Sequence, residues 1–219
     1  MKRISAYFIS ILLFPVISQI RAQDSINLQM KIRLGADLYG PVTYFTDRNI
    51  LSTEGFLSVD IDSNKSVVIE AGYLDFKYSQ YNYDYFSRGA FIRLGVDFNL
   101  IDPVVASGKY YAGIGLRYGL SIFRSEVPFL KHDNYWGNVE GSVPPSTYSA
   151  HFIEVSPGIR TELFRNFTIG WAIRLRILIY SATGKDIKAI YIPGFGDGSK
   201  SFSPGINYYL IWSIPYKKL

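Results

Sequence analysis

The two histidines are the side chains of this chain best suited to acid–base catalysis near neutral pH. His132 is followed by Asp133, and His151 lies two residues after Ser149 and three before Glu154. A serine, a histidine and a carboxylate can form a hydrolytic triad when their side chains converge. If this segment is a strand, Ser149 and His151 point to one face and Glu154 to the other. His151 and His132 are therefore candidate catalytic residues, but their neighbours in the sequence do not complete a catalytic site.

Oxygen-bearing side chains in two polar segments could in principle bind a cation. Asp133, Asn134 and Glu140 lie in one segment and Asp197 in the other, but their spacing does not match a calcium-binding loop. The glycines of residues 194–198 do not form a phosphate cradle, because no strand–turn–helix pattern surrounds them. We therefore expect no metal site and no cofactor.

Charged residues also recur at every second position in several segments. Arginines and acids alternate there with apolar residues, and the two signs nearly balance. Buried charge is costly unless it is paired, so a balanced set of this kind predicts an enclosed ion-pair network. The residues expected in it are Arg33, Asp37, Asp60, Glu70, Arg93, Asp97, Arg117, Glu154, Arg160, Glu162, Arg174 and Arg176.

The elements that carry these charges are predicted to be strands. Residues 167–180 show the pattern most clearly, because one alternate set is wholly apolar and the other contains Arg174 and Arg176. A helix would place these two arginines about 200° apart and leave no clean face. Seven further segments alternate in the same way, and the eight predicted strands are residues 28–39, 56–62, 67–78, 90–99, 110–123, 152–164, 167–180 and 202–216.

The predicted connections alternate between long and short. Four segments are expected to be loops on one side, namely residues 41–53, 79–85, 124–147 and 181–201, whereas the three tighter turns fall on the other side. Bacterial outer-membrane barrels have this asymmetry, with an even number of strands, short periplasmic turns and longer external loops.

The polar face of the predicted strands distinguishes a membrane barrel from a soluble β-sandwich or lipocalin-like barrel. It combines glycines with arginines, for example Gly115 beside Arg117. Glycine weakens a solvent-facing strand, but small residues beside large ones fill the interior of a narrow barrel. We therefore expect an all-β fold, an eight-stranded antiparallel up-and-down transmembrane β-barrel, whose filled interior leaves no open pore.

The N-terminus predicts export. Two basic residues follow Met1 and precede an apolar run over residues 4–20, and Ala22 supplies the small residue of a cleavage site. We expect residues 1–22 to be a signal peptide and residues 23–219 to form one outer-membrane β-barrel domain. The predicted location is the outer membrane of a Gram-negative bacterium.

Charge and cysteine content agree with export. The formal charge of +5 falls to +2 without the predicted signal peptide, which carries Lys2, Arg3 and Arg21 and no acid. The basic character is therefore weak evidence for nucleic acid, and we expect no nucleic-acid partner. The chain has no cysteine, and a closed barrel is stable without disulfides because its backbone hydrogen bonds are all made between neighbouring strands.

Several segments resemble an uncharacterised Bacteroidota family of small outer-membrane β-barrel proteins. They are Gln23 after the predicted cleavage site and residues 115–120, 191–195 and 213–218, and the resemblance runs from about residue 28 to the end. It implies the fold and the location and no catalytic residue. One departure is that Tyr216 is followed by two lysines and a leucine, whereas many outer-membrane proteins end on an aromatic residue.

These observations leave three functional hypotheses. The first is a non-enzymatic barrel, surrounded by outer-membrane lipid, that serves as a structural or partner-binding subunit of an envelope complex. Its contacts with other envelope proteins would come from residues 124–147 and 181–201, because loops on a rigid scaffold carry most binding sites. The second is an enzyme, a hydrolase or acyltransferase with a site at the barrel rim, that acts on lipid or lipopolysaccharide. The third is a narrow channel for small solutes.

Overall fold

The computed structural model describes residues 29–102, 106, 109–134, 137–182 and 189–218. Side chains at positions 132–134, 138 and 139 are not described. The predicted signal peptide over residues 1–22 lies outside the described residues and stays a prediction. Among the described residues, no helix is long and apolar enough to cross a membrane.

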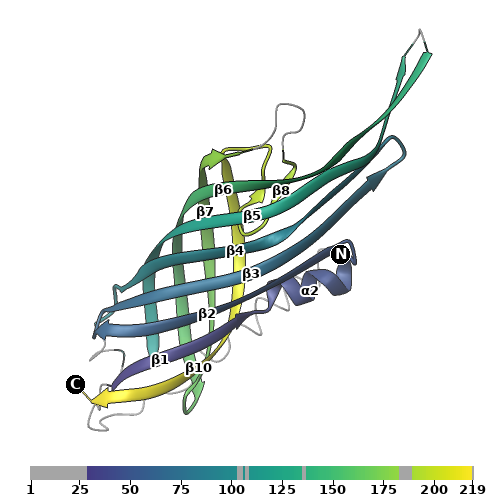
Figure 1. The fold of residues 1–219 in the computed structure, drawn as a ribbon. Coiled ribbons are helices and arrows are strands. Elements are labelled where there is room, and N and C mark those ends of the chain that lie inside the picture. The colour runs from purple at the N-terminus through teal and green to yellow at the C-terminus, as the bar shows by residue number, and fades with distance from the viewer. Residues whose placement is uncertain (1–28, 103–105, 107–108, 135–136, 183–188, 219) are drawn as a thin grey trace.

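Eight antiparallel strands form a closed ring (Figure 1). Each long strand pairs with its neighbours along the chain, and β1 pairs with β10 to close the barrel. This arrangement confirms the predicted eight-stranded antiparallel up-and-down barrel. The ring consists of β1 (Gln29–Asp37), β2 (Ile50–Asp62), β3 (Lys65–Gln80), β4 (Tyr83–Asn99), β5 (Tyr110–Asn134), β6 (Gly137–Phe164), β7 (Phe167–Ser181) and β10 (Phe202–Lys218).

The alternation in sequence becomes an inner and an outer face of the barrel. In β7, for example, Ala172 and Arg174 are buried inside the ring, whereas Trp171 and Ile173 are exposed on the outside. Every strand of the ring exposes large apolar side chains outward, which form a continuous apolar belt. One member from each strand, in chain order, is Leu34, Leu57, Ile69, Leu94, Leu116, Ile153, Ile173 and Ile206.

The two ends of the barrel differ. One end, which we call the turn end, carries the connections over residues 63–64, 100–109 and 165–166 together with the start of β1 and the end of β10. The opposite end, which we call the loop end, carries the other four connections. This division of the connections is the one that the sequence predicts.

The prediction of an irregular loop over residues 124–147 is wrong. β5 and β6 continue through this segment as a hairpin that projects beyond the other strands at the loop end (Figure 1). The ladder with β7 begins only at Ala150, so residues 137–148 of β6 form an edge strand with no ladder partner on that side among the described residues. Pro144 and Pro145 are tolerated because proline is compatible with an edge strand. These prolines and the glycines nearby obscured the strand in the sequence.

Two further loop predictions are also wrong. The expected loop over residues 41–53 contains the helix α2 (Tyr39–Thr46) and the first residues of β2. Gly40 is buried against β2, where the carbonyl of Ser52 leaves no room for a Cβ atom. The expected loop over residues 79–85 is a two-residue turn between β3 and β4, since the strands extend to Gln80 and from Tyr83.

Candidate functional site

The middle of the barrel is filled by a network of charged side chains, which we call the lumen cluster. At its centre the Arg93 guanidinium contacts three carboxylates from other strands. Its Nη1 lies 2.8 Å from Glu154 Oε2, its Nε lies 3.0 Å from Glu70 Oε2, and its Nη2 pairs with Glu54. Arg176 also reaches Glu154, at 3.0 Å.

Two more arginines extend the lumen cluster. Arg117 donates from Nε to Glu70 at 2.7 Å and from Nη2 to Asp97 at 2.7 Å, and Arg160 pairs with the second oxygen of Asp97. Arg174 pairs with Glu54 and donates from Nε to the Tyr209 hydroxyl at 3.0 Å. The lumen cluster consists of Glu54, Glu70, Arg93, Asp97, Arg117, Glu154, Arg160, Arg174 and Arg176.

This arrangement suits a filled interior better than a passage. The five arginines and four carboxylates leave one excess positive charge, and six of the nine are buried. Breaking a buried ion pair by removing one partner costs about 3–5 kcal/mol. The charged side chains are therefore expected to stay paired across the interior. Beside the cluster a cavity remains whose volume is only about 20 Å³, which is room for about one water molecule.

The structure brings together eight of the twelve residues that the sequence nominates for an enclosed ion-pair network. Arg33 instead pairs with Asp60, and Glu162 pairs with Lys31 at 2.6 Å, nearer the turn end. Asp37 stands apart, because its carboxylate accepts the backbone N–H groups of Tyr39 and Tyr208.

Sequence reasoning missed two members of this interior. Glu54 falls just outside the predicted strand over residues 56–62, although it continues the alternation of Phe56, Ser58 and Asp60 on the inward face. Extending that strand by two residues would have found it. Tyr209 gives no comparable signal, because a tyrosine on the polar face of a strand does not reveal its arginine partner.

A second group of residues closes the barrel between the lumen cluster and the loop end. Residues 189–198, which we call the plug, fold into the barrel mouth, with Ile192 and Phe195 fully buried. This corrects the expectation that all of residues 181–201 form an external loop. The Phe195 ring lies 5.7 Å from that of Phe152, and the Phe195 carbonyl accepts a hydrogen bond from Arg176 at 2.9 Å.

Short strands and unusual backbone angles shape the plug. It contains β8 (Tyr191–Ile192) and β9 (Gly196–Asp197), which are joined through glycines with positive φ. Positive φ is accessible to glycine at little cost. The hydroxyl of Ser87 on β4 donates to the carbonyl of Tyr191 at 2.9 Å. At the exposed end, hydrogen bonds from Ser199 lower the pKa of Asp197.

The histidines do not form an active site with the nominated partners. His151 lies on the outer surface of β6, where its Nδ1 is 2.7 Å from the Tyr118 hydroxyl and its ring faces Tyr180. Glu154 points into the lumen and is fully buried. His132 lies on the projecting part of β5, paired with Val139, and its side chain is not described. Within the described part of the chain, no cluster of three or more His, Cys, Asp or Glu side chains could hold a metal.

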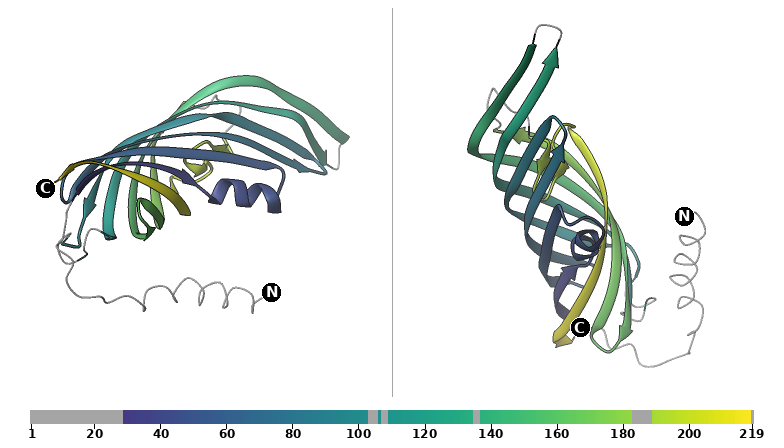
Figure 2. Two further views of the ribbon diagram at one scale, coloured as in Figure 1. Left: turned by 90° about the horizontal axis from the view of Figure 1, so that it is seen from below. Right: turned by 90° about the vertical axis from the view of Figure 1, so that its right-hand side faces the viewer.

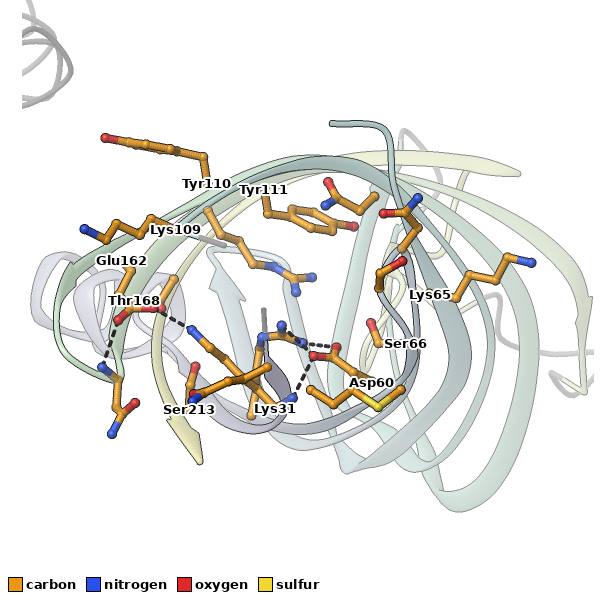
Figure 3. Close-up of a pocket in the computed structure, with 18 of the residues that line it drawn as sticks. Lys31, Asp60, Lys65, Ser66, Lys109, Tyr110, Tyr111, Glu162, Thr168 and Ser213 are labelled. Carbon is orange, nitrogen blue, oxygen red and sulfur yellow. Dashed lines mark hydrogen bonds and ion pairs between the residues drawn. The ribbon is translucent and has the colours of Figure 1, made fainter. Parts of the chain in front are cut away.

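The turn end contains a polar cavity of about 300 Å³ (Figure 3). Side chains from strands on opposite sides of the ring point into it, among them Lys31 from β1, Tyr111 from β5 and Ser213 from β10. Tyr111 and Arg160 stack at 4.4 Å beside the lumen cluster. The cavity is therefore open toward the turn end and bordered on its inner side by the lumen cluster.

Comparisons with known proteins identify the family of this chain. A family model described as "Domain of unknown function (DUF6048)" matches residues 1–219. The chain belongs to this family. No curated protein gives a significant match.

Two solved structures are similar in outline. A major outer membrane protein from Thermus thermophilus is 10% identical, with a TM-score of 0.46, and the match covers 85% of this chain and 98% of that chain. CarO from Acinetobacter baumannii is 8% identical, with a TM-score of 0.41, and the match covers 89% of this chain and 100% of that one.

Proposed function

We propose that this protein is a non-enzymatic outer-membrane β-barrel of a Gram-negative bacterium, without an open pore, that presents its projecting β5–β6 hairpin to a protein partner in an envelope complex. Its turn end would face the periplasm and its loop end the exterior. The proposal rests on the apolar belt around the closed ring, on the filled interior and on the β6 edge of the hairpin, which has no ladder partner among the described residues.

The apolar belt is the observation that carries the membrane assignment. All eight strands expose leucine, isoleucine or aromatic side chains on the outside, and every strand of the ring except β10 directs arginines or carboxylates inside. Monomeric soluble proteins rarely expose contiguous apolar surface of more than a few hundred Å², whereas a membrane barrel needs an outward apolar band around its whole circumference. The inverted distribution of polarity therefore supports a lipid environment.

The interior supports a role other than transport or catalysis. The lumen cluster and the plug fill the barrel at two levels, which disfavours a solute channel. His151, on the outer surface beside Tyr118, has no carboxylate of the described residues within hydrogen-bond distance, which disfavours a rim enzyme.

The β5–β6 hairpin supports a partner-binding role. Its β6 edge over residues 137–148 offers backbone groups with no ladder partner among the described residues. A long edge strand is a place where another chain can add a strand. The hairpin projects away from the ring (Figure 2), so an external partner can reach it.

The test begins with the membrane fraction of cells that produce the full chain. Faster migration of unboiled protein on a gel would support a closed membrane barrel, and a soluble protein without this shift would overturn the assignment. A photo-cross-linking residue at Ser142 should then capture a discrete partner. The same residue at Arg48, which is exposed in the connection after α2, serves as the matched control.

A shortened hairpin tests the role of the projecting segment. Val127 and Val143 pair across it, so residues 128–142 can be replaced by Asn-Gly, which favours a tight hairpin turn. We expect the barrel to keep its heat-modifiable migration and the partner to be lost from pull-downs in mild detergent. Retention of the partner by this variant would contradict the proposal.

A further inference from the structure

The cavity at the turn end has properties that the lumen cluster and the plug do not explain. Six basic and three acidic side chains line it, which leaves an excess of three positive charges. Two of the basic residues are already neutralised in the wall, because Lys31 pairs with Glu162 and Arg33 with Asp60. A third, Arg160, pairs with Asp97 of the lumen cluster.

The remaining three basic residues stand at the rim. Lys65 follows the turn between β2 and β3, Lys109 precedes β5, and Arg165 lies in the turn between β6 and β7. None of the three forms an ion pair with a carboxylate among the described residues. Each comes from a different connection, so the three charges surround one opening.

The wall also holds a hydroxyl group that lacks a partner. Ser213 on β10 lines the cavity and is only 1% exposed, and its Oγ has no hydrogen-bond partner among the described residues. A buried polar atom without a partner costs free energy. A ligand that accepts a hydrogen bond from this hydroxyl would remove that cost. Figure 3 shows Ser213 across the cavity from Tyr111, with Thr168 nearby.

We propose that this cavity binds a small anion that carries a carboxylate or phosphate group and enters from the turn end. Its volume of about 300 Å³ lies at the lower limit of known ligand pockets, which suits a small molecule or one terminal group of a larger one. The rim charges attract the anion, and the buried Ser213 hydroxyl donates a hydrogen bond to it inside the cavity. The assignment of the turn end to the periplasm rests on the proposed function, whereas the binding itself does not.

The experiment uses full-length protein refolded in detergent, with heat-modifiable migration as the check that it is folded. Isothermal titration at low ionic strength would compare citrate, pyrophosphate and the neutral sugar sucrose. We expect saturable binding of at least one anion and none of sucrose, weakened by added salt because the rim charges are exposed. Stronger binding of citrate would identify the ligand group as a carboxylate, and stronger binding of pyrophosphate would identify a phosphate.

Two variants locate the binding. The triple variant Lys65→Gln, Lys109→Gln and Arg165→Gln should bind the preferred anion about tenfold more weakly, since three exposed charge interactions are lost. The matched control is Arg48→Gln, Lys77→Gln and Lys200→Gln, which removes the same three charges at the loop end, where these residues are exposed. The control should bind like the unmodified protein.

Ser213→Ala should also weaken binding, by about tenfold, because a hydrogen bond to a charged group is lost. Absence of anion binding, or equal weakening in the rim variant and its control, would overturn the proposal. Either result would leave the membrane assignment intact, since heat-modifiable migration tests the barrel separately.

Discussion

At the centre of the barrel, Glu70 contacts three arginines at once. Its carboxylate lies 2.7 Å from Arg117, 3.0 Å from Arg93 and 3.4 Å from Arg174. Such a residue stabilises only as part of a set, because removing its charge leaves the surrounding guanidiniums buried without full compensation.

Glu70→Gln tests this dependence. We expect the free energy of unfolding to fall by about 3 kcal/mol, since the variant keeps the shape of the side chain and loses its charge. Urea titration with heat-modifiable migration as the readout would measure the change. Glu140→Gln, at an exposed position of the projecting hairpin, should change stability by less than about 0.5 kcal/mol. Equal effects of the two substitutions on the free energy of unfolding would show that the buried ion pairs do not contribute to the stability of the barrel.

At the residue scale the sequence was informative about which charges are buried and uninformative about which of them pair. Alternation alone places Arg93, Glu154 and Arg174 on the inward face. It cannot show that Arg93 on β4 meets Glu54 on β2 and Glu154 on β6, because those contacts cross the lumen and depend on the stagger of the strands around the ring.

Among the elements, the plug was the least predictable from sequence. Its short β-strands contain only two residues each, so no periodicity reveals them. Its burial depends on apolar residues of several different strands, such as Phe152 on β6 and Phe76 on β3, whose ring stacks on Tyr191 at 4.7 Å. The same limit applies to the β5–β6 hairpin, where prolines and glycines suggested a loop.

Phe195→Ala tests whether the plug contributes to the stability of the folded barrel. The Phe195 side chain is fully buried, and the loss of such a ring from a packed interior costs about 3–5 kcal/mol. We expect a lower urea midpoint, corresponding to a loss of that order. Tyr81→Ala, at a position that is 83% exposed, should cost less than about 1 kcal/mol. A Phe195→Ala midpoint equal to that of the control would mean that the plug is not packed in the mouth.

The helix α2 exposes an apolar stripe at the loop end of the barrel. Leu38, Val42 and Phe45 follow helical spacing and are exposed, Phe45 to 86%. The Leu38 amide donates to the carbonyl of Tyr208 at 2.8 Å, which joins the start of the helix to β10. An exposed helix with such a stripe fits the membrane interface, so we expect it to lie on the outer leaflet.

A spin label measures the depth of this helix. The chain has no cysteine, so Phe45→Cys can be labelled at a single site with a nitroxide after reconstitution in lipid vesicles. Because the stripe contacts acyl chains, we expect the label to collide more often with oxygen than with a water-soluble nickel complex. The control Arg48→Cys, in the connection after the helix, should show the opposite preference. Greater access of the nickel complex to position 45 would place the stripe in water.

For the molecule as a whole, the number of strands and the end at which each connection lies could be predicted from the sequence. Both follow from the alternation within each strand and from the lengths of the connections. An even set of amphipathic strands with short and long connections in alternation leaves few other arrangements. The extension of β5 and β6 beyond the other strands of the barrel could not be predicted from the sequence. It depends on how far β5 and β6 keep pairing after the other strands have ended, which composition does not reveal.

The lumen cluster and the plug each close the interior, so we expect the barrel not to conduct ions even when the plug is removed. The lumen cluster lies below the plug, and its arginines and carboxylates cross the interior from β2, β4, β6 and β7. A variant with residues 189–198 replaced by Gly-Ser should therefore show no conductance above baseline in a planar bilayer, like the unmodified protein. Heat-modifiable migration would verify that both proteins are folded, and an established porin would serve as the conducting control. Discrete conductance steps in the plug-deleted variant alone would mean that the plug is the only barrier and that the ion pairs leave a passage. Steps in the unmodified protein would contradict the filled interior and favour a solute channel.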